Sequence, residues 1–171
     1  MESREVVPSL SPSMDIQVSS NFERLLFDLL DRRGAPVAAL MAEFKKSGRF
    51  ELGAGALKRA RELFDGARLD DEETKKAIAQ IHSETGTLVD PHSAVGIMAG
   101  RARRRDKSIP MVAIATAHPA KFPDAVEAAS GIRPALPPHL ADLFERAERC
   151  DVLANDLGVV RTYIASRAGA A

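Results

Sequence analysis

A continuous apolar run, Met111 to Thr116, constrains the fold of this chain more than any other feature. The run has the length of a β-strand and lacks the polar–apolar alternation of a strand with one wet face. We therefore expect a strand that is buried on both faces, as in a parallel sheet. A second short strand at 151–153 and helical patterns around both predict a helix-rich α/β fold, with a few short parallel strands flanked by helices.

The rest of the chain contains several residue patterns that are typical of helix starts and helix ends. Capping pairs or caps predict helix starts at Ser20 with Glu23, Asp70 with Glu73, Asp90 with Pro91, and Asp156. Glycines predict helix ends, at Gly34, Gly48 and Gly131. Further helices are expected at 123–130 and 139–148. We predict three parts: a loop and capped helix at 1–34, a helical unit at 35–85 and an α/β segment at 86–171.

Composition excludes several classes of protein. The 171 residues are 45% apolar, which is enough to bury a core, and 24 Lys+Arg balance 24 Asp+Glu, which argues against a general nucleic-acid binder. No apolar run reaches the roughly 18–20 residues of a membrane span, and the N-terminus lacks the apolar core of a signal peptide, so we expect a cytoplasmic protein. The single Cys150 and four histidines without ligand spacing predict no metal site.

The first candidate site is the segment Thr116 to Phe122, which directly follows the expected strand. Ligands in open α/β sheets bind at the carboxyl ends of strands. Thr116 offers a neutral hydroxyl there, His118 a titratable ring and Lys121 a point charge suited to phosphate. A plain strand-to-helix turn with a solvated lysine explains the same residues, and from spacing alone it is the more common case.

Two further segments hold polar side chains near expected helix starts. Ser11 to Asp15 leads into a helix start with Asn21 and Arg24, where amides and the helix dipole could hold an anion. An ordinary capped helix is the alternative. In Asp90-Pro91-His92-Ser93, a simple N-cap followed by an N1 proline already accounts for the pattern.

Taken together, the three segments resemble threonine synthase, a pyridoxal-phosphate enzyme of fold type II. The matching stretches are Leu10–Ile16 with Ser20–Arg24, Thr87–Val95, and Thr116–Phe122. Their order and spacing also fit, and Thr-Ala-His-Pro-Ala-Lys-Phe is an unusual sequence. The resemblance runs from about residue 6 to residue 164 and corresponds to the C-terminal portion of the family's longer polypeptide.

The resemblance implies an enzyme that, in the complete chain, converts O-phospho-L-homoserine and water to L-threonine and phosphate with pyridoxal 5'-phosphate as cofactor. Thr116 matches the family position whose hydroxyl faces the pyridine nitrogen of the cofactor. Lys121, Asn21 and Arg24 are the residues from which we expect substrate binding, through the phosphate or carboxylate group.

One departure from the family limits this expectation. The Schiff-base lysine of the family lies in a Ser-Phe-Lys-Asp-like segment, and none of the seven lysines here has that setting. A cofactor-phosphate loop rich in Gly, Ser and Asn is also absent. We therefore expect no catalytic residue in this chain, no turnover by the chain alone, and a missing N-terminal portion as its partner. The alternatives are a non-catalytic remnant or partner-binding module, and a related fold-type-II lyase with another substrate.

Overall fold

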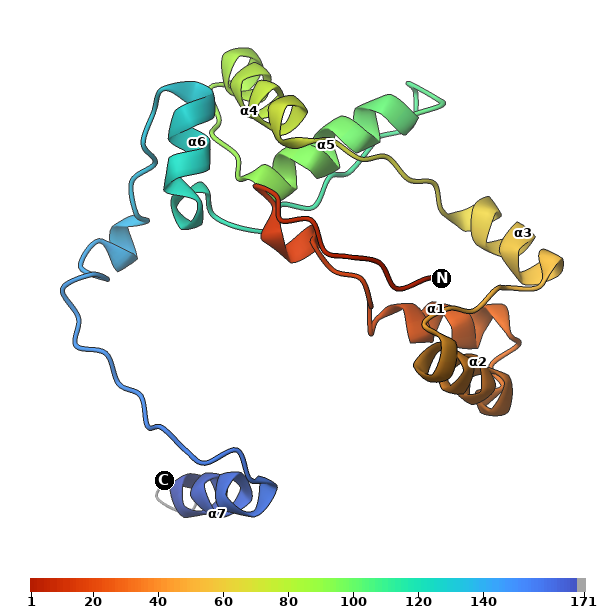
Figure 1. Cartoon of the computed structure of the whole chain (residues 1–171). Coiled ribbons are helices and arrows are strands. Elements are labelled where there is room, and N and C mark those ends of the chain that lie inside the picture. Colours follow the sequence, from red (N-terminus) through yellow and green to blue (C-terminus); the bar gives the residue numbers. More distant parts are fainter. Residues whose placement is uncertain (169–171) are drawn as a thin grey trace. The chain divides into compact units, whose positions relative to one another are not determined.

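The computed structural model describes residues 1–168, and helices dominate it (Figure 1). The chain divides into two compact units, Met1–Ala135 and a second that begins at Leu136. The first unit contains α1 (Phe22–Leu29), α2 (Gly34–Ser47), α3 (Ala54–Leu63), α4 (Asp71–Thr85), α5 (Pro91–Arg103) and α6 (Pro123–Ser130), with short 3-10 turns η1 (Pro12–Met14) and η2 (Pro119–Lys121). The second contains η3 (Pro138–Leu140) and α7 (Leu157–Ala168). The predicted division at 34 and 85 stays a prediction.

The core of the first unit lies where α4 packs against both α5 and α6 (Figure 1). Its buried side chains come from all three helices, namely Ala77, Ile78, Ile81, Ala94 and Val126. The set consists of small alanines and branched side chains, which are sizes that favour close packing of helices. This packing fixes the start of α5 and the turn before α6, which carry the polar residues described below.

The helices α1, α2 and α3 form a second area of packing in the same unit, with α1 against both α2 and α3. Leu26 and Leu29 are the buried residues of α1. Phe50, which follows α2, is buried and meets the ring of Phe44 edge-on at a centroid distance of 6.0 Å. None of the helices in the described part of the chain combines the length and the apolar character that a membrane crossing requires.

Several helix boundaries confirm the sequence predictions. The capping box before α4 is complete, since Asp70 accepts from the Glu73 amide and the Glu73 side chain accepts from the Asp70 amide. Asp90 caps α5 and Pro91 is its first residue. Gly131 ends α6 in the left-handed region at a φ of 74°. In the second unit, Asp156 accepts from the Val159 amide at 2.9 Å at the start of α7.

Three predicted helix features are wrong. Ser20 does not cap α1, because the N-cap is Asn21, whose backbone is already helical and whose side chain makes no capping bond. Gly34 does not end that helix either, but is the first residue of α2. The helix expected at 139–148 is replaced by η3 and turns, and residues 141–150 are exposed. A short helix without apolar surface to cover it is marginal in water.

No strand forms among residues 1–168, apart from an isolated antiparallel bridge between Glu2 and Arg49. The helix-rich part of the fold prediction is confirmed, whereas the short parallel strands expected at 111–116 and 151–153 are not found. Val112 and Ile114 are 76% and 73% exposed, so the apolar run is uncovered. A strand needs a neighbouring strand to satisfy its backbone groups, and the described residues provide none for this run.

Candidate functional site

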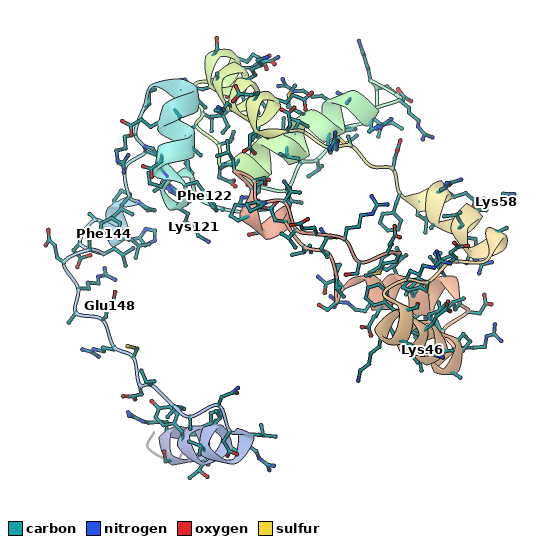
Figure 2. The ribbon with its side chains drawn as sticks, viewed as in Figure 1. Lys46, Lys58, Lys121, Phe122, Phe144 and Glu148 are labelled. Atoms are coloured by element: carbon teal, nitrogen blue, oxygen red, sulfur yellow. The ribbon has the colours of Figure 1, made fainter. Side chains whose placement is uncertain are left out.

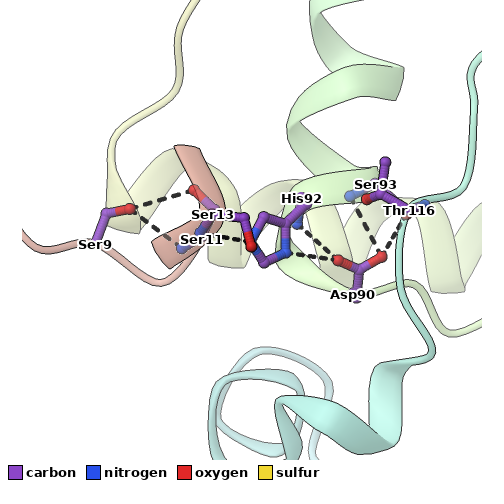
Figure 3. Close-up of polar contacts among 7 residues, drawn as sticks. All are labelled: Ser9, Ser11, Ser13, Asp90, His92, Ser93 and Thr116. Atoms are coloured by element: carbon purple, nitrogen blue, oxygen red, sulfur yellow. Dashed lines mark hydrogen bonds and ion pairs between the residues drawn. The ribbon is translucent and has the colours of Figure 1, made fainter. Parts of the chain in front are cut away.

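Three segments that are far apart in the sequence meet at the N-terminus of α5 (Figure 3). The η1 turn arrives on one side, where the Ser13 amide donates to His92 Nε2 at 3.2 Å. The end of the apolar run arrives on the other side, where the Thr116 amide donates to Ser93 Oγ at 3.1 Å. The first residues of α5 therefore bind the backbones of both other segments.

A buried carboxylate organises this meeting point. Asp90 is fully buried, and its Oδ1 accepts from the His92 amide at 3.0 Å and from His92 Nδ1 at 2.9 Å. Its Oδ2 accepts from the Ser93 hydroxyl and, at 3.4 Å, from the Ser93 amide. These donors and the positive end of the α5 dipole replace the water that the carboxylate lost on burial.

The hydrogen-bond partners fix the state of His92. A backbone amide can only donate, so His92 Nε2 must be the acceptor for Ser13, and the ring proton lies on Nδ1. The contact with Asp90 is therefore a hydrogen bond from a neutral imidazole. The ring is 4% exposed and packs against Phe122, with centroids 4.8 Å apart and planes inclined by 55°.

The segment that precedes η1 is held by the carboxylate of Asp15, the residue that directly follows this turn. The Ser9 amide and hydroxyl both donate to Asp15 at 2.7 Å, and the Ser9 and Ser11 hydroxyls lie 3.2 Å apart. The Leu10 amide donates to Asp71 Oδ1, in the first turn of α4, at 3.0 Å. The loop is thus attached to both α4 and α5, and the buried Ser11 lies within it.

Thr116, predicted as a cofactor contact, lies at this meeting point. Its amide is held by Ser93, while its exposed side-chain hydroxyl has no hydrogen-bond partner among residues 1–168. Lys121 lies in η2, at the turn that leads into α6, and forms no ion pair with any residue of the described chain (Figure 2). His118 shapes this turn, because its Nδ1 accepts from the Ala120 amide at 3.2 Å. A hydroxyl and a cation that have no partner among the described residues therefore lie on one short segment.

Asn21 and Arg24, the other predicted substrate ligands, lie at the start of α1. The Asn21 side-chain oxygen accepts a hydrogen bond from the Arg24 guanidinium. Within residues 1–168 no hydrogen bond or ion pair joins either side chain to Thr116 or Lys121. Their assignment to substrate binding stays a prediction.

Sequence reasoning missed the roles of His92, Ser93 and Ser13. The pattern Asp-Pro-His-Ser contained a signal, since two polar side chains follow the N-cap at positions whose amides the cap already uses. The capping explanation was correct but incomplete: the same carboxylate also binds both side chains. Their burial depends on η1 and Phe122, which the local pattern does not contain.

Comparison with known proteins finds threonine synthases that match most of this chain. The family described as threonine synthase, C-terminal, matches residues 93–164. The threonine synthase of Pseudomonas aeruginosa is 55% identical over 158 residues, which is 92% of this chain and 34% of that protein. The threonine synthase of Corynebacterium glutamicum is 36% identical, over 90% of this chain and 33% of that protein.

Solved structures give the same result. A threonine synthase from Brucella melitensis with bound pyridoxal phosphate superposes with a TM-score of 0.84 and 47% identity, over 95% of this chain and 35% of that one. The yeast threonine synthase gives 0.79 and 33% identity, over 98% of this chain and 38% of that one. The chain thus spans about a third of the length of the relatives that it matches.

Proposed function

Because this chain is a C-terminal segment of the threonine synthase family, we propose that it supplies part of an active site that converts O-phospho-L-homoserine and water to L-threonine and phosphate in a complete chain. One observation carries the proposal. Three of the stretches on which the sequence resembles threonine synthase, Leu10–Ile16, Thr87–Val95 and Thr116–Phe122, are joined by hydrogen bonds at the start of α5. Segments of an enzyme that meet in this way around a buried polar network are typical of a binding site on a rigid support.

The residues present fit pyridoxal 5'-phosphate in part. The Thr116 hydroxyl is exposed and lacks a partner among residues 1–168, while its backbone is held in place, so it can share a hydrogen bond with a pyridine nitrogen. A neutral hydroxyl, unlike a carboxylate, does not favour protonation of that nitrogen. When bound, the cofactor supplies an electron sink for the carbanions of the reaction.

Lys121 is the residue that we assign to the phosphate group of the substrate. Its ammonium is exposed, five residues after Thr116, and forms no ion pair with any described residue. A compact cation on a flexible stem suits a phosphate, which approaches from solvent and leaves again as product. Asn21 and Arg24 are weaker candidates for the substrate carboxylate, because they already bind each other.

The covalent attachment of the cofactor requires a lysine in another setting, which we place in a missing N-terminal portion. We therefore propose that the chain by itself is inactive, and that it acts in the cytoplasm as part of a longer polypeptide or complex. The test is a chimera in which this chain replaces the matching segment of the Pseudomonas aeruginosa relative. Threonine formation and phosphate release are measured with O-phospho-L-homoserine, for the chimera and for the chain alone.

We expect turnover by the chimera and none by the chain alone; turnover by the chain alone would overturn the assignment of the missing lysine. In the chimera, T116V should change the cofactor absorbance and lower turnover, whereas T116S should retain both. K121A should weaken binding of the phosphorylated substrate more than binding of unphosphorylated homoserine or serine. Equal loss for all substrates would contradict the phosphate role of Lys121.

A non-catalytic remnant or partner-binding module is the second candidate function, favoured by the absence of the Schiff-base lysine motif from the sequence. A chimera that folds and shows cofactor absorbance but forms no threonine would support it against the first. Turnover of homoserine or serine in preference to the phosphorylated substrate would instead indicate a related lyase.

A further inference from the structure

We propose that Asp90, His92 and Ser93 are positioning residues: the buried Asp90 carboxylate directs one hydrogen bond through Ser93 to Thr116 and another through His92 to η1. The hydrogen-bond network itself is a property of this chain. Its consequence for the cofactor rests on the proposed function. The inference goes beyond capping, because a cap would need only the backbone amides of α5.

We call the two hydrogen-bonded paths from Asp90 the Ser93 arm and the His92 arm. In the Ser93 arm, the direction of each hydrogen bond is fixed. A carboxylate oxygen can only accept, so the Ser93 hydroxyl hydrogen is committed to Asp90 Oδ2. The lone pairs of Ser93 Oγ are then free to accept from the Thr116 amide at 3.1 Å. This bond is the link that holds the end of the apolar run at the start of α5.

The His92 arm is fixed by the same logic. Asp90 Oδ1 accepts from His92 Nδ1 at 2.9 Å, so the proton is drawn to Nδ1 and Nε2 is left as an acceptor. The Ser13 amide occupies Nε2 at 3.2 Å. One carboxylate, with each oxygen serving one arm, thus presents two acceptors to the backbones of two separate segments (Figure 3).

Each arm predicts the loss of protection of one backbone amide, independently of the other. Both losses can be measured on the chain itself by amide hydrogen exchange. Removing the Ser93 hydroxyl should speed exchange of the Thr116 amide about tenfold and leave the Ser13 amide unchanged. H92F retains an apolar ring against Phe122 but removes Nε2, so it should speed exchange at Ser13 and leave Thr116 unchanged.

A matched pair separates the hydroxyl from the space it occupies. S93T and S93V add nearly the same volume to a buried position and differ in the hydroxyl. S93T should retain protection of Thr116, and S93V should lose it. If the two variants behave alike, Ser93 acts by packing and the proposed positioning is wrong.

The unmodified chain provides a test that needs no variant. The nitrogen chemical shifts of the His92 ring should show the neutral tautomer with its proton on Nδ1. A proton on Nε2 would exclude the bond from Ser13 and overturn the His92 arm.

The chimera tests the consequence for the cofactor. In the parent background, S93V should change the cofactor absorbance and lower kcat. The separate variant S93T should keep both at the parent values. Because Ser93 acts through Thr116, S93V should add little once T116V is present, and full additivity would refute the coupling. An inactive chimera whose amides exchange as expected would refute the proposed function and leave the positioning intact. An active chimera in which S93T and S93V have the same kcat and cofactor absorbance would refute the positioning and leave the proposed function intact.

Discussion

Ile78 is the residue on which the packing around the site depends most directly. Its side chain is fully buried on the face of α4 that meets α5 and α6, among Ala77, Ala94 and Val126. I78A removes roughly three methylene equivalents, worth about 0.8 kcal/mol each. The cavity that remains adds to this loss, so we expect the free energy of unfolding of the first unit to fall by about 3 kcal/mol.

Urea unfolding, followed through the amide signals of α5 and α6 by NMR, measures this loss without contribution from α7. I78V removes one methylene and should cost roughly 1 kcal/mol. K76A, at an exposed position of the same helix, should stay within about 0.5 kcal/mol of the parent. A loss for I78A no greater than that for K76A would refute the packing of α4 described above.

Three smaller predictions concern helix ends and one ion pair. D70A should lower the free energy of unfolding by about 1 kcal/mol, measured by urea unfolding, because the capping box of α4 is lost. G131A should cost about 1 kcal/mol in the same assay, since its φ of 74° strains any residue with a Cβ. The Arg101 guanidinium holds the pKa of Glu84 below its usual 4.5, so the pair stabilises above pH 4.5 and is lost as pH falls through the lowered pKa. An NMR titration should show this midpoint return toward 4.5 in R101A.

Local chemistry decided what could be predicted about the fold. The capping box at Asp70 and the left-handed end at Gly131 depend on a few neighbouring residues, so the sequence contains what is needed to find them. Ser20 misled because Asn21, next to it, takes the cap position and binds Arg24 instead of the helix amides. Serine and asparagine have similar preferences for the N-cap position. Where the two are adjacent, the sequence does not decide at which of them the helix begins.

The expected strand at 111–116 shows the limit of reasoning from one segment. An apolar run without alternation indicates burial, but the chain covers neither face of this one within the described residues. Burial depends on which other segments pack against the run, and the described residues supply no strand beside it. The same dependence applies to the candidate site: the place of Thr116 after the run made it a candidate, whereas its hydrogen bond to Ser93 depends on the fold.

The link between Thr116 and Ser93 has a mechanical consequence for the apolar run. The thirteen residues of α5 span roughly 20 Å, whereas residues 104–115, which return from its far end, could reach roughly 40 Å. The excess length is taken up in a turn, where the Arg104 guanidinium donates to the Ile109 carbonyl at 2.7 Å. The segment from 104 to 115 is therefore longer than the distance that it has to cover between the two ends of α5, and the bond from Thr116 to Ser93 fixes where it ends.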